Sequence, residues 1–228
     1  MSSDGSVCGH TFPMPANETT RLQALHELNL LDTPREESFD KITALAAKLF
    51  KVPIALVSLI DTDRQWFKVR VCLGARAPLP QPQPPRRTAR AHPSLTRATP
   101  QSNIGSITSV PETPRDQAFC AHAVMPDAPD VFVVLDATQD ERFKDNPLVT
   151  GGPLIRFYAG APLLVSVGSG QIVRLGTICV IDTVPREEFS VMDKQSLMDV
   201  ASLVVDAIQL RQQTAQELVA FKQQCVAL

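Results

Sequence analysis

An almost wholly apolar run, Pro-Ile-Ala-Leu-Val-Ser-Leu-Ile-Asp, occupies residues 53–61. Because alternate side chains of a strand point to opposite faces, this run places apolar groups on both faces of an extended chain. It therefore predicts a central strand that is covered on both sides. The chain has 228 residues, of which 44% are hydrophobic and 20% charged, and this is enough for one sizeable core around such a strand.

Two helices are expected before this strand. The second is expected to start with Thr33 as its N-cap, because Pro34 suits the first helical position and Glu36 can reach back to the amide of the cap. It should end near Phe50, since Pro53 disfavours helix just before it. Each helix has one apolar side, with Leu22, Leu25 and Leu28 in the first and Phe39, Ile42, Ala46 and Leu49 in the second.

A β-hairpin is expected directly after the apolar run. Residues 61–64 have the composition of a turn. The run that follows alternates, with Phe67, Val69 and Val71 facing inward and Lys68 and Arg70 facing outward. This alternation predicts that the second strand of the hairpin has one face in water.

The rest of the chain adds further strands and short helices. A short helix is expected at residues 113–123, and strands at 131–136, 157–167 and 172–182. The last two strands are joined by Gly-Ser-Gly at 168–170, a plausible hairpin connection. Runs joined by tight turns favour an antiparallel sheet, so the sequence predicts an α+β domain with helices covering the sheet rather than a doubly wound fold.

A last helix is expected to open at Ser190, with Asp193 three residues later. Apolar residues continue at heptad spacing, with Leu197, Val204, Leu218 and Cys225 at a positions and Val200, Ala207, Phe221 and Leu228 at d positions. Arg211 and Thr214 interrupt this seam. Two interpretations stay open: one core helix followed by a frayed tail, or a helix that leaves the domain to dimerise or to join an output module.

Residues 75–111 differ in composition from the rest of the chain. They are rich in proline and arginine and contain no acidic residue. Such a stretch cannot bury enough apolar surface to offset its ordering entropy, so we expect a disordered basic insertion. The expected organisation is a loose N-terminal tail at 1–16, one folded domain at 17–213 that contains this insertion, and a C-terminal helical extension at 214–228.

Charge and cysteine content disfavour several classes of protein. The formal net charge of −2 gives no electrostatic reason to expect nucleic acid or an anionic membrane as a partner. No segment reaches the ~18 to 20 consecutive apolar residues that a membrane span needs, and the start does not resemble a signal peptide, so we expect a cytoplasmic protein. The cysteines are scattered without CxxC spacing, which indicates neither a metal site nor a disulfide framework.

Several segments, taken in order, resemble one known family, the GAF domains, and in particular a subgroup common in bacterial-type sensor histidine kinases and diguanylate cyclases. These segments are LNLLDTPREESFD at 28–40, IALVSLID at 54–61, RQWFK at 64–68, FCAHA at 119–123, DERF at 140–143, NPLV at 146–149, IRFYAGAPL at 155–163 and LGTICVID at 175–182. Each motif alone is weak, but their order makes the resemblance specific.

The resemblance implies a six-stranded antiparallel sheet with helices on one face and a ligand-sized cavity on the other. It also implies a regulatory role in signal transduction, with an unknown small molecule as ligand and a kinase or cyclase as output module. No such output sequence follows Leu228, so three alternatives stay open: that module is absent, lies on another chain, or lies outside the present sequence. A homodimer through the C-terminal helix is a further expectation, and no cofactor can be named.

The same resemblance selects a set of candidate ligand-binding residues. They are Phe119, Cys120, His122, Asp136, Phe143, Asn146, Phe157, Tyr158 and Cys179. Most of them also have a structural interpretation: buried aromatics and cysteines are common in cores, and Asn146 can cap a short helix. No residue is assigned a catalytic or metal-binding role.

The sequence is compatible with three functions. The first is a regulatory domain that senses a small molecule. The second is an interaction or dimerisation module whose pocket is closed by side chains. The third is an enzyme, a cysteine-based reductase of free methionine sulfoxide, for which Cys120 and Cys179 would be the thiols, although their spacing does not match that of such reductases. We expect the first, and not an enzyme.

Overall fold

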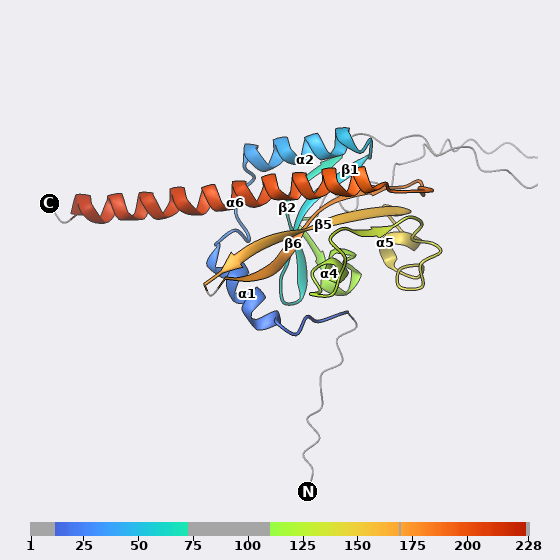
Figure 1. Ribbon diagram of the computed structural model, residues 1–228, viewed down its shortest axis with the longest axis horizontal. Helices are drawn as coiled ribbons and strands as arrows, with labels where there is room; N and C mark the ends of the chain where they lie inside the picture. The colour runs from blue at the N-terminus through green and yellow to red at the C-terminus, as the bar shows by residue number, and fades with distance from the viewer. Residues whose placement is uncertain (1–11, 73–109, 169, 227–228) are drawn as a thin grey trace, which may run out of the picture.

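The computed structural model describes residues 12–72, 110–168 and 170–226. Its described strands form a six-stranded antiparallel sheet in the order β3-β2-β1-β6-β5-β4 (Figure 1). The strands are β1 (Ile54–Ile60), β2 (Arg64–Cys72), β3 (Glu112–Pro114), β4 (Phe132–Val134), β5 (Phe157–Val167) and β6 (Gln171–Asp182). The helices are α1 (Glu18–Glu27), α2 (Glu37–Leu49), the 3₁₀ helix η1 (Arg115–Gln117), α4 (Cys120–Ala123), α5 (Pro147–Thr150) and α6 (Val191–Val226). The predicted α+β fold class, a six-stranded antiparallel sheet with flanking helices, is confirmed.

The sheet separates two apolar cores. The helix-side core lies between the sheet and helices α1, α2 and α6, and includes Leu25, Phe39 and Val204. The pocket-side core lies on the opposite face, under the segment that carries α4 and α5, and includes Phe119 and Phe143. In Figure 1 α2 and α6 run side by side on one side of the sheet, with α4 on the other.

Strand β1 is the central, covered strand that the sequence predicts. All seven of its residues are buried, and it pairs with β2 on one side and β6 on the other. Ala55, Val57 and Leu59 belong to the helix-side core, whereas Leu56 and Ile60 belong to the pocket-side core. Strands β5 and β6 and the start of α6 also lie where predicted.

The predicted start of α2 is wrong. The helix begins at Glu37, and the cap position, Glu36, has no side-chain capping hydrogen bond. The Thr33 hydroxyl instead donates to the Leu30 carbonyl at 2.6 Å and accepts from the Lys68 ammonium at 2.8 Å. The side chains that would form a capping box are therefore used by a buried lysine.

The predicted alternation in β2 is also wrong. Val57 pairs with Val69 but Ser58 pairs with Phe67, so Lys68 is the extra residue of a β-bulge. As a result, Phe67 faces the pocket-side core and Val69 the helix-side core, rather than one common face. Lys68, expected in water, is 2% exposed.

The predicted short helix at 113–123 is replaced by three elements, β3, η1 and α4. Strand β3 pairs with the first residues of β2 and forms the edge of the sheet. Most of the predicted insertion, and positions 1–11 of the predicted tail, lie outside the described residues. At the end of the insertion, the Pro111 carbonyl accepts a hydrogen bond from the Phe67 amide at 3.0 Å.

Helix α6 is one continuous helix of 36 residues. Its first half packs on the sheet, where Leu197, Val204 and Ile208 are buried, and residues 213–225 are all exposed. Figure 1 shows the second half extending beyond the rest of the domain. In the part of the chain that the structure describes, no helix is long and apolar enough to cross a membrane.

Candidate functional site

The candidate site lies on the pocket-side face of the sheet. Strand alternation places Ser58 of β1, Tyr158 of β5, and Thr177 and Cys179 of β6 on this face. Helix α4 lies over them and brings Cys120 down onto the sheet. The site therefore combines side chains from three central strands with one short helix.

Hydrogen-bond donors surround the Cys120 sulfur. The Ser58 hydroxyl and the Gln65 amide each donate to Sγ at 3.2 Å, and the Tyr158 hydroxyl donates at 3.1 Å. The Cys179 sulfur lies 3.9 Å away. Cys120 is only 2% exposed and Cys179 fully buried, so these contacts take the place of water.

Burial and hydrogen bonding act in opposite directions on the two thiols. Burial by itself raises the pKa of Cys120, but hydrogen bonds from Cys179, Ser58, Thr177 and Tyr158 outweigh it and hold that pKa below the usual thiol range. Burial, and then the neighbouring Cys120, raise the pKa of Cys179 well above its ordinary value. The surroundings therefore favour the ionised form of Cys120 over that of Cys179.

Aromatic rings enclose this sulfur pair. The Phe119 ring stacks on Phe143 with centroids 3.9 Å apart, and lies 5.2 Å from the Tyr158 ring. Phe132 meets Phe143 and Tyr158 edge to face, at 6.1 and 6.0 Å. His122, at the partly exposed rim, contacts Phe143 edge-on at 4.9 Å, and burial lowers the pKa of its imidazole.

A cavity of about 20 Å³ remains beside Cys120. This volume accommodates about one water molecule, far less than the several hundred Å³ of a typical small-molecule pocket. Among the described residues, the aromatic rings thus largely fill the site where the resemblance implies a ligand-sized cavity. The cavity is lined by Leu56, Gln65, Phe67, Thr113, Phe119, Cys120, Leu148, Ile155, Tyr158 and Ile181.

The structure brings together only some of the predicted site residues. Phe119, Cys120, Phe143, Tyr158 and Cys179 converge, with His122 at the rim. The other three lie elsewhere, as described next.

Asp136, Asn146 and Phe157 have local structural roles. The Asp136 carboxylate accepts hydrogen bonds from the amide and hydroxyl of Thr138, which closes the turn after β4. Asn146 caps α5 by accepting from the Leu148 amide at 2.9 Å. Phe157 points to the helix-side core. Neighbours in a strand alternate in facing, so Phe157 and Tyr158 cannot share one pocket.

The sequence reasoning missed the polar members of the site. Ser58, Gln65, Thr113 and Thr177 are all buried, and none was selected. A signal was present, because Ser58 and Thr177 are isolated hydroxyl residues within apolar strands. A buried polar group needs a partner, so such positions indicate a polar site inside the fold.

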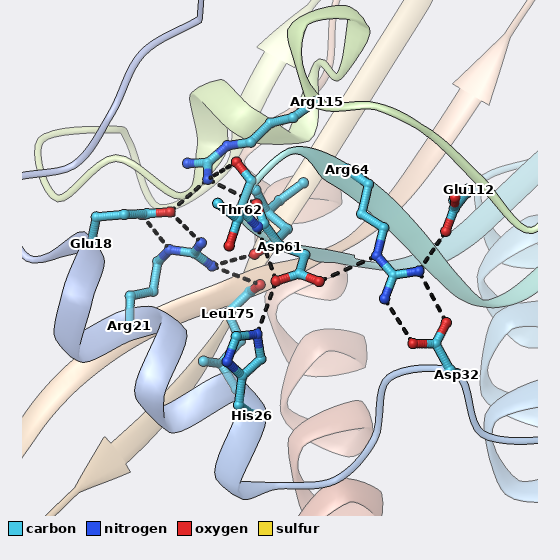
Figure 2. Close-up of polar contacts among 11 residues, drawn as sticks. Glu18, Arg21, His26, Asp32, Asp61, Thr62, Arg64, Glu112, Arg115 and Leu175 are labelled. Carbon is cyan, nitrogen blue, oxygen red and sulfur yellow. Dashed lines mark hydrogen bonds and ion pairs between the residues drawn. The ribbon is translucent and has the colours of Figure 1, made fainter. Parts of the chain in front are cut away.

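A polar network lies at the turn where β1 ends and β2 begins (Figure 2). Glu18 accepts hydrogen bonds from Arg21 and Arg115, whose side chains are both fully buried. Arg115 also donates to the Asp61 carbonyl at 2.8 Å, and the Asp61 carboxylate meets Arg64 at 3.2 Å. The network fastens α1 and η1 to the turn between β1 and β2.

A shorter chain of contacts joins β2 to α6. The Lys68 ammonium donates to the Glu36 carboxylate at 2.6 Å, and the Arg211 guanidinium donates to the same oxygen at 3.0 Å. Arg211 lies where α6 leaves the domain. Gln65 and Phe67, which line the cavity, precede Lys68 in the same strand. Among the described residues, no group of three or more His, Cys, Asp or Glu side chains is placed to hold a metal ion.

The fold and this site define an α+β domain, with a small buried pocket on one face of the sheet and a projecting helix on the other. The sequence signature of the GAF domain matches residues 34–208, which is more than half of the chain. The chain belongs to the GAF domain family.

The chain is similar in sequence to a named bacterial protein and in fold to a solved structure. The chain is 36% identical over 198 residues to a protein of Pseudomonas aeruginosa named a cyclic di-GMP phosphodiesterase, a match that covers 87% of this chain and 27% of that protein. The chain thus spans about a quarter of the length of that relative. Among solved structures it is similar to a far-red cyanobacteriochrome photoreceptor, with 13% identity, a TM-score of 0.50, and coverage of 85% of this chain and 92% of that one. The second likeness concerns the fold alone.

Proposed function

We propose that this domain is the input part of a signalling protein, which senses a small molecule at the Cys120 pocket and controls an output module through α6. The observation that carries the proposal is the Lys68–Glu36–Arg211 chain. It connects a strand that lines the pocket to the point where α6 leaves the domain. A change in the pocket that moves β2 would alter contacts that hold α6.

The relative supports a specific class of output. Its name assigns it turnover of cyclic di-GMP, and the match covers only 27% of it. We propose that the output controlled through α6 is of this kind, with the domain as regulator. A match to about a quarter of a longer relative fits a module that biases a separate output rather than one that acts alone.

Hydrogen exchange of α6 tests the coupling. Phe143→Leu removes the ring stacked on Phe119 and should loosen the pocket without touching α6. We expect amide exchange around Arg211 to become faster by severalfold, on the order of tenfold at most, because local stability there depends on the contact chain. The measurement is exchange followed by mass spectrometry on the full chain.

Two glutamate variants provide the matched control. Glu36→Gln weakens the link between Lys68 and Arg211, so Phe143→Leu should affect α6 less in this background. Glu37→Gln makes the same substitution one residue later, at a side chain that is 80% exposed and pairs only locally with Lys41. Equal α6 responses in the two backgrounds, or none to Phe143→Leu, would reject the proposed route.

The interaction-module function is the second candidate, and the filled pocket favours it. A cavity of about 20 Å³ holds no metabolite unless Phe119 or Phe143 moves. The exposed half of α6 meanwhile presents Leu218 and Phe221, which are 53% and 63% exposed. The two candidates differ in the hydrogen-exchange experiment, since a module that only docks needs no coupling between pocket and helix.

The reductase alternative meets a steric obstacle. Cys120 and Cys179 do lie 3.9 Å apart, but the cavity beside them has no room for an amino acid. We therefore expect no thiol-dependent turnover of free methionine sulfoxide. An assay with dithiothreitol as reductant and Cys120→Ser as control measures this, and Cys120-dependent turnover would restore the enzyme hypothesis.

A further inference from the structure

We propose that Cys120 and Cys179 form a peroxide-sensing thiol pair, in which a small peroxide oxidises Cys120 within the cavity and Cys179 resolves the product to a disulfide. A peroxide would then be the input of the proposed sensor. Only the effect of oxidation on α6 rests on the proposed function. The chemical step stands on the geometry of the site itself.

The first observation is the arrangement of the two sulfurs. They lie 3.9 Å apart, one on α4 and the other on β6, and a disulfide needs about 2.05 Å. The sulfurs therefore need to approach by about 1.9 Å, which a small shift of the short helix α4 supplies. Ser58, Gln65 and Tyr158 all donate toward Cys120, which favours its thiolate as the attacking group.

The second observation is the cavity. Thr113 is 8% exposed, its hydroxyl is buried without a hydrogen-bond partner, and it lines the same cavity as Cys120. A buried hydroxyl of this kind calls for a small polar molecule beside it. The volume of about 20 Å³ selects water or a molecule of similar size, such as hydrogen peroxide, against larger ligands.

The chemistry balances with hydrogen peroxide as the oxidant. The Cys120 thiolate attacks one peroxide oxygen, the O–O bond breaks, and hydroxide leaves and takes up a proton to become water. Cys120 is then a sulfenic acid. The Cys179 sulfur attacks it, the S–O bond breaks, an S–S bond forms and a second water leaves. Two thiols are oxidised and one peroxide is reduced to two waters.

Oxidation changes the contacts that reach α6. The disulfide draws α4 toward β6, and Phe119, at the start of α4, moves with it against Phe143. The Cys120 sulfur also ceases to be a strong acceptor for Gln65, which lies in β2 three residues before Lys68. The change therefore enters the strand that is linked to α6 through Glu36.

The test is oxidation of the full chain in a Cys8→Ser, Cys225→Ser background, which removes the exposed thiol of the described residues and the one cysteine outside them. After brief treatment with hydrogen peroxide, we expect an intact mass lower by two hydrogens and a peptide that joins Cys120 to Cys179 on non-reducing digestion. Dithiothreitol should reverse both. Cumene hydroperoxide, too bulky for the cavity, should react more slowly by on the order of tenfold or more.

Variants separate the two chemical steps. Cys179→Ser should stop at a sulfenic acid on Cys120 that dimedone traps, and Cys120→Ser should give neither product. Cys72→Ser, at a half-buried thiol at the end of β2, should behave like the parent. Absence of both the disulfide and the dimedone adduct in the folded parent chain, or equal rates with the two peroxides, overturns the proposal.

The outcomes also distinguish this inference from the proposed function. If the disulfide forms but α6 exchange does not change, the thiol chemistry stands and the proposed route to α6 fails. If no oxidation occurs but Phe143→Leu still loosens α6 through Glu36, the regulatory route stands and its input is another molecule.

Discussion

Glu18 lies between two fully buried guanidinium groups, those of Arg21 and Arg115 (Figure 2). Burial alone would raise the pKa of this carboxyl, but the hydrogen bonds and charges of the two arginines outweigh it and lower the pKa. Its loss leaves two like charges in the interior without their shared counter-ion. We expect Glu18→Gln to lower the free energy of unfolding by about 3 kcal/mol, measured by urea denaturation at neutral pH.

The same substitution should show a defined pH dependence. A carboxyl whose folded pKa is depressed contributes stability above its unfolded pKa of about 4.3 and loses it as pH falls through the folded value. The difference between wild type and Glu18→Gln should therefore be largest near neutrality and shrink below about pH 4. Glu27→Gln, at an exposed position of the same helix, is the control. A pH-independent difference would contradict this account.

Gly160 makes room for the Tyr158 hydroxyl, which lies over it on the pocket-side face of β5. A methyl group at 160 would overlap that hydroxyl and lie 2.9 Å from the ring carbon that bears it. Because the ring is buried among other aromatics, Gly160→Ala should destabilise the fold by about 1–3 kcal/mol, measured by urea denaturation. It should also raise the pKa of Cys120, since the tyrosine donor is displaced.

A double-mutant comparison checks the cause. Tyr158→Phe removes the overlapping oxygen, so Gly160→Ala should cost less in that background than in the wild type. Equal costs in both backgrounds would show that the strand backbone, and not the tyrosine, responds to the added methyl group.

At the level of elements, local signals predict local structure. The apolar run of β1, the hairpin of β5 and β6, and the capping box of Ser190 and Asp193 are each specified within a few residues, and each lies where expected. The same holds for the Asn146 cap of α5. In these elements local propensity and tertiary packing favour the same structure, so the sequence alone is sufficient to predict them.

Elements that depend on distant partners could not be predicted in this way. Thr33 has the sequence of a helix cap but accepts from Lys68, which lies 35 residues further along the chain. The bulge that buries Lys68 has no local signature, and β3 is too short to show a period. Long-range partners of this kind override local preference.

In the candidate site, too, some residues could be predicted from the sequence, whereas others depend on distant partners. Both thiols and three of the aromatic members, Phe119, Phe143 and Tyr158, were predicted because the resemblance selects them. Gln65 of β2 and Thr113 of the edge strand β3 reach the site only through tertiary pairing.

The second obstacle to predicting the site was deciding which face of the sheet each side chain occupies. Phe157 and Tyr158 are adjacent in sequence, and only the register of β5 decides which of them meets Cys120.

At the scale of the whole molecule, α6 belongs to two environments. Its first half is part of the helix-side core, and its second half, beyond Arg211, exposes apolar side chains at heptad positions. An open groove of about 460 Å³ runs along this seam, lined by Glu36, Ser38, Ala207, Leu210, Arg211, Thr214, Ala215 and Leu218. We expect a second copy of α6 to pack on this surface, because the same apolar positions would pair across a parallel seam.

Leu218→Asp tests this pairing. Leu218 occupies a seam position and is 53% exposed, so a charge there should weaken a homodimer by roughly tenfold or more while leaving the monomer folded. Gln216→Asp adds the same charge on the opposite side of the helix and should leave association unchanged. Sedimentation velocity measures the effect.

In a parallel dimer the two exposed Cys225 thiols would also face each other, so oxidation should cross-link wild type and Gln216→Asp but not Leu218→Asp. A monomeric wild type, or equal loss in both variants, would leave the seam to bind an output module instead of a second copy.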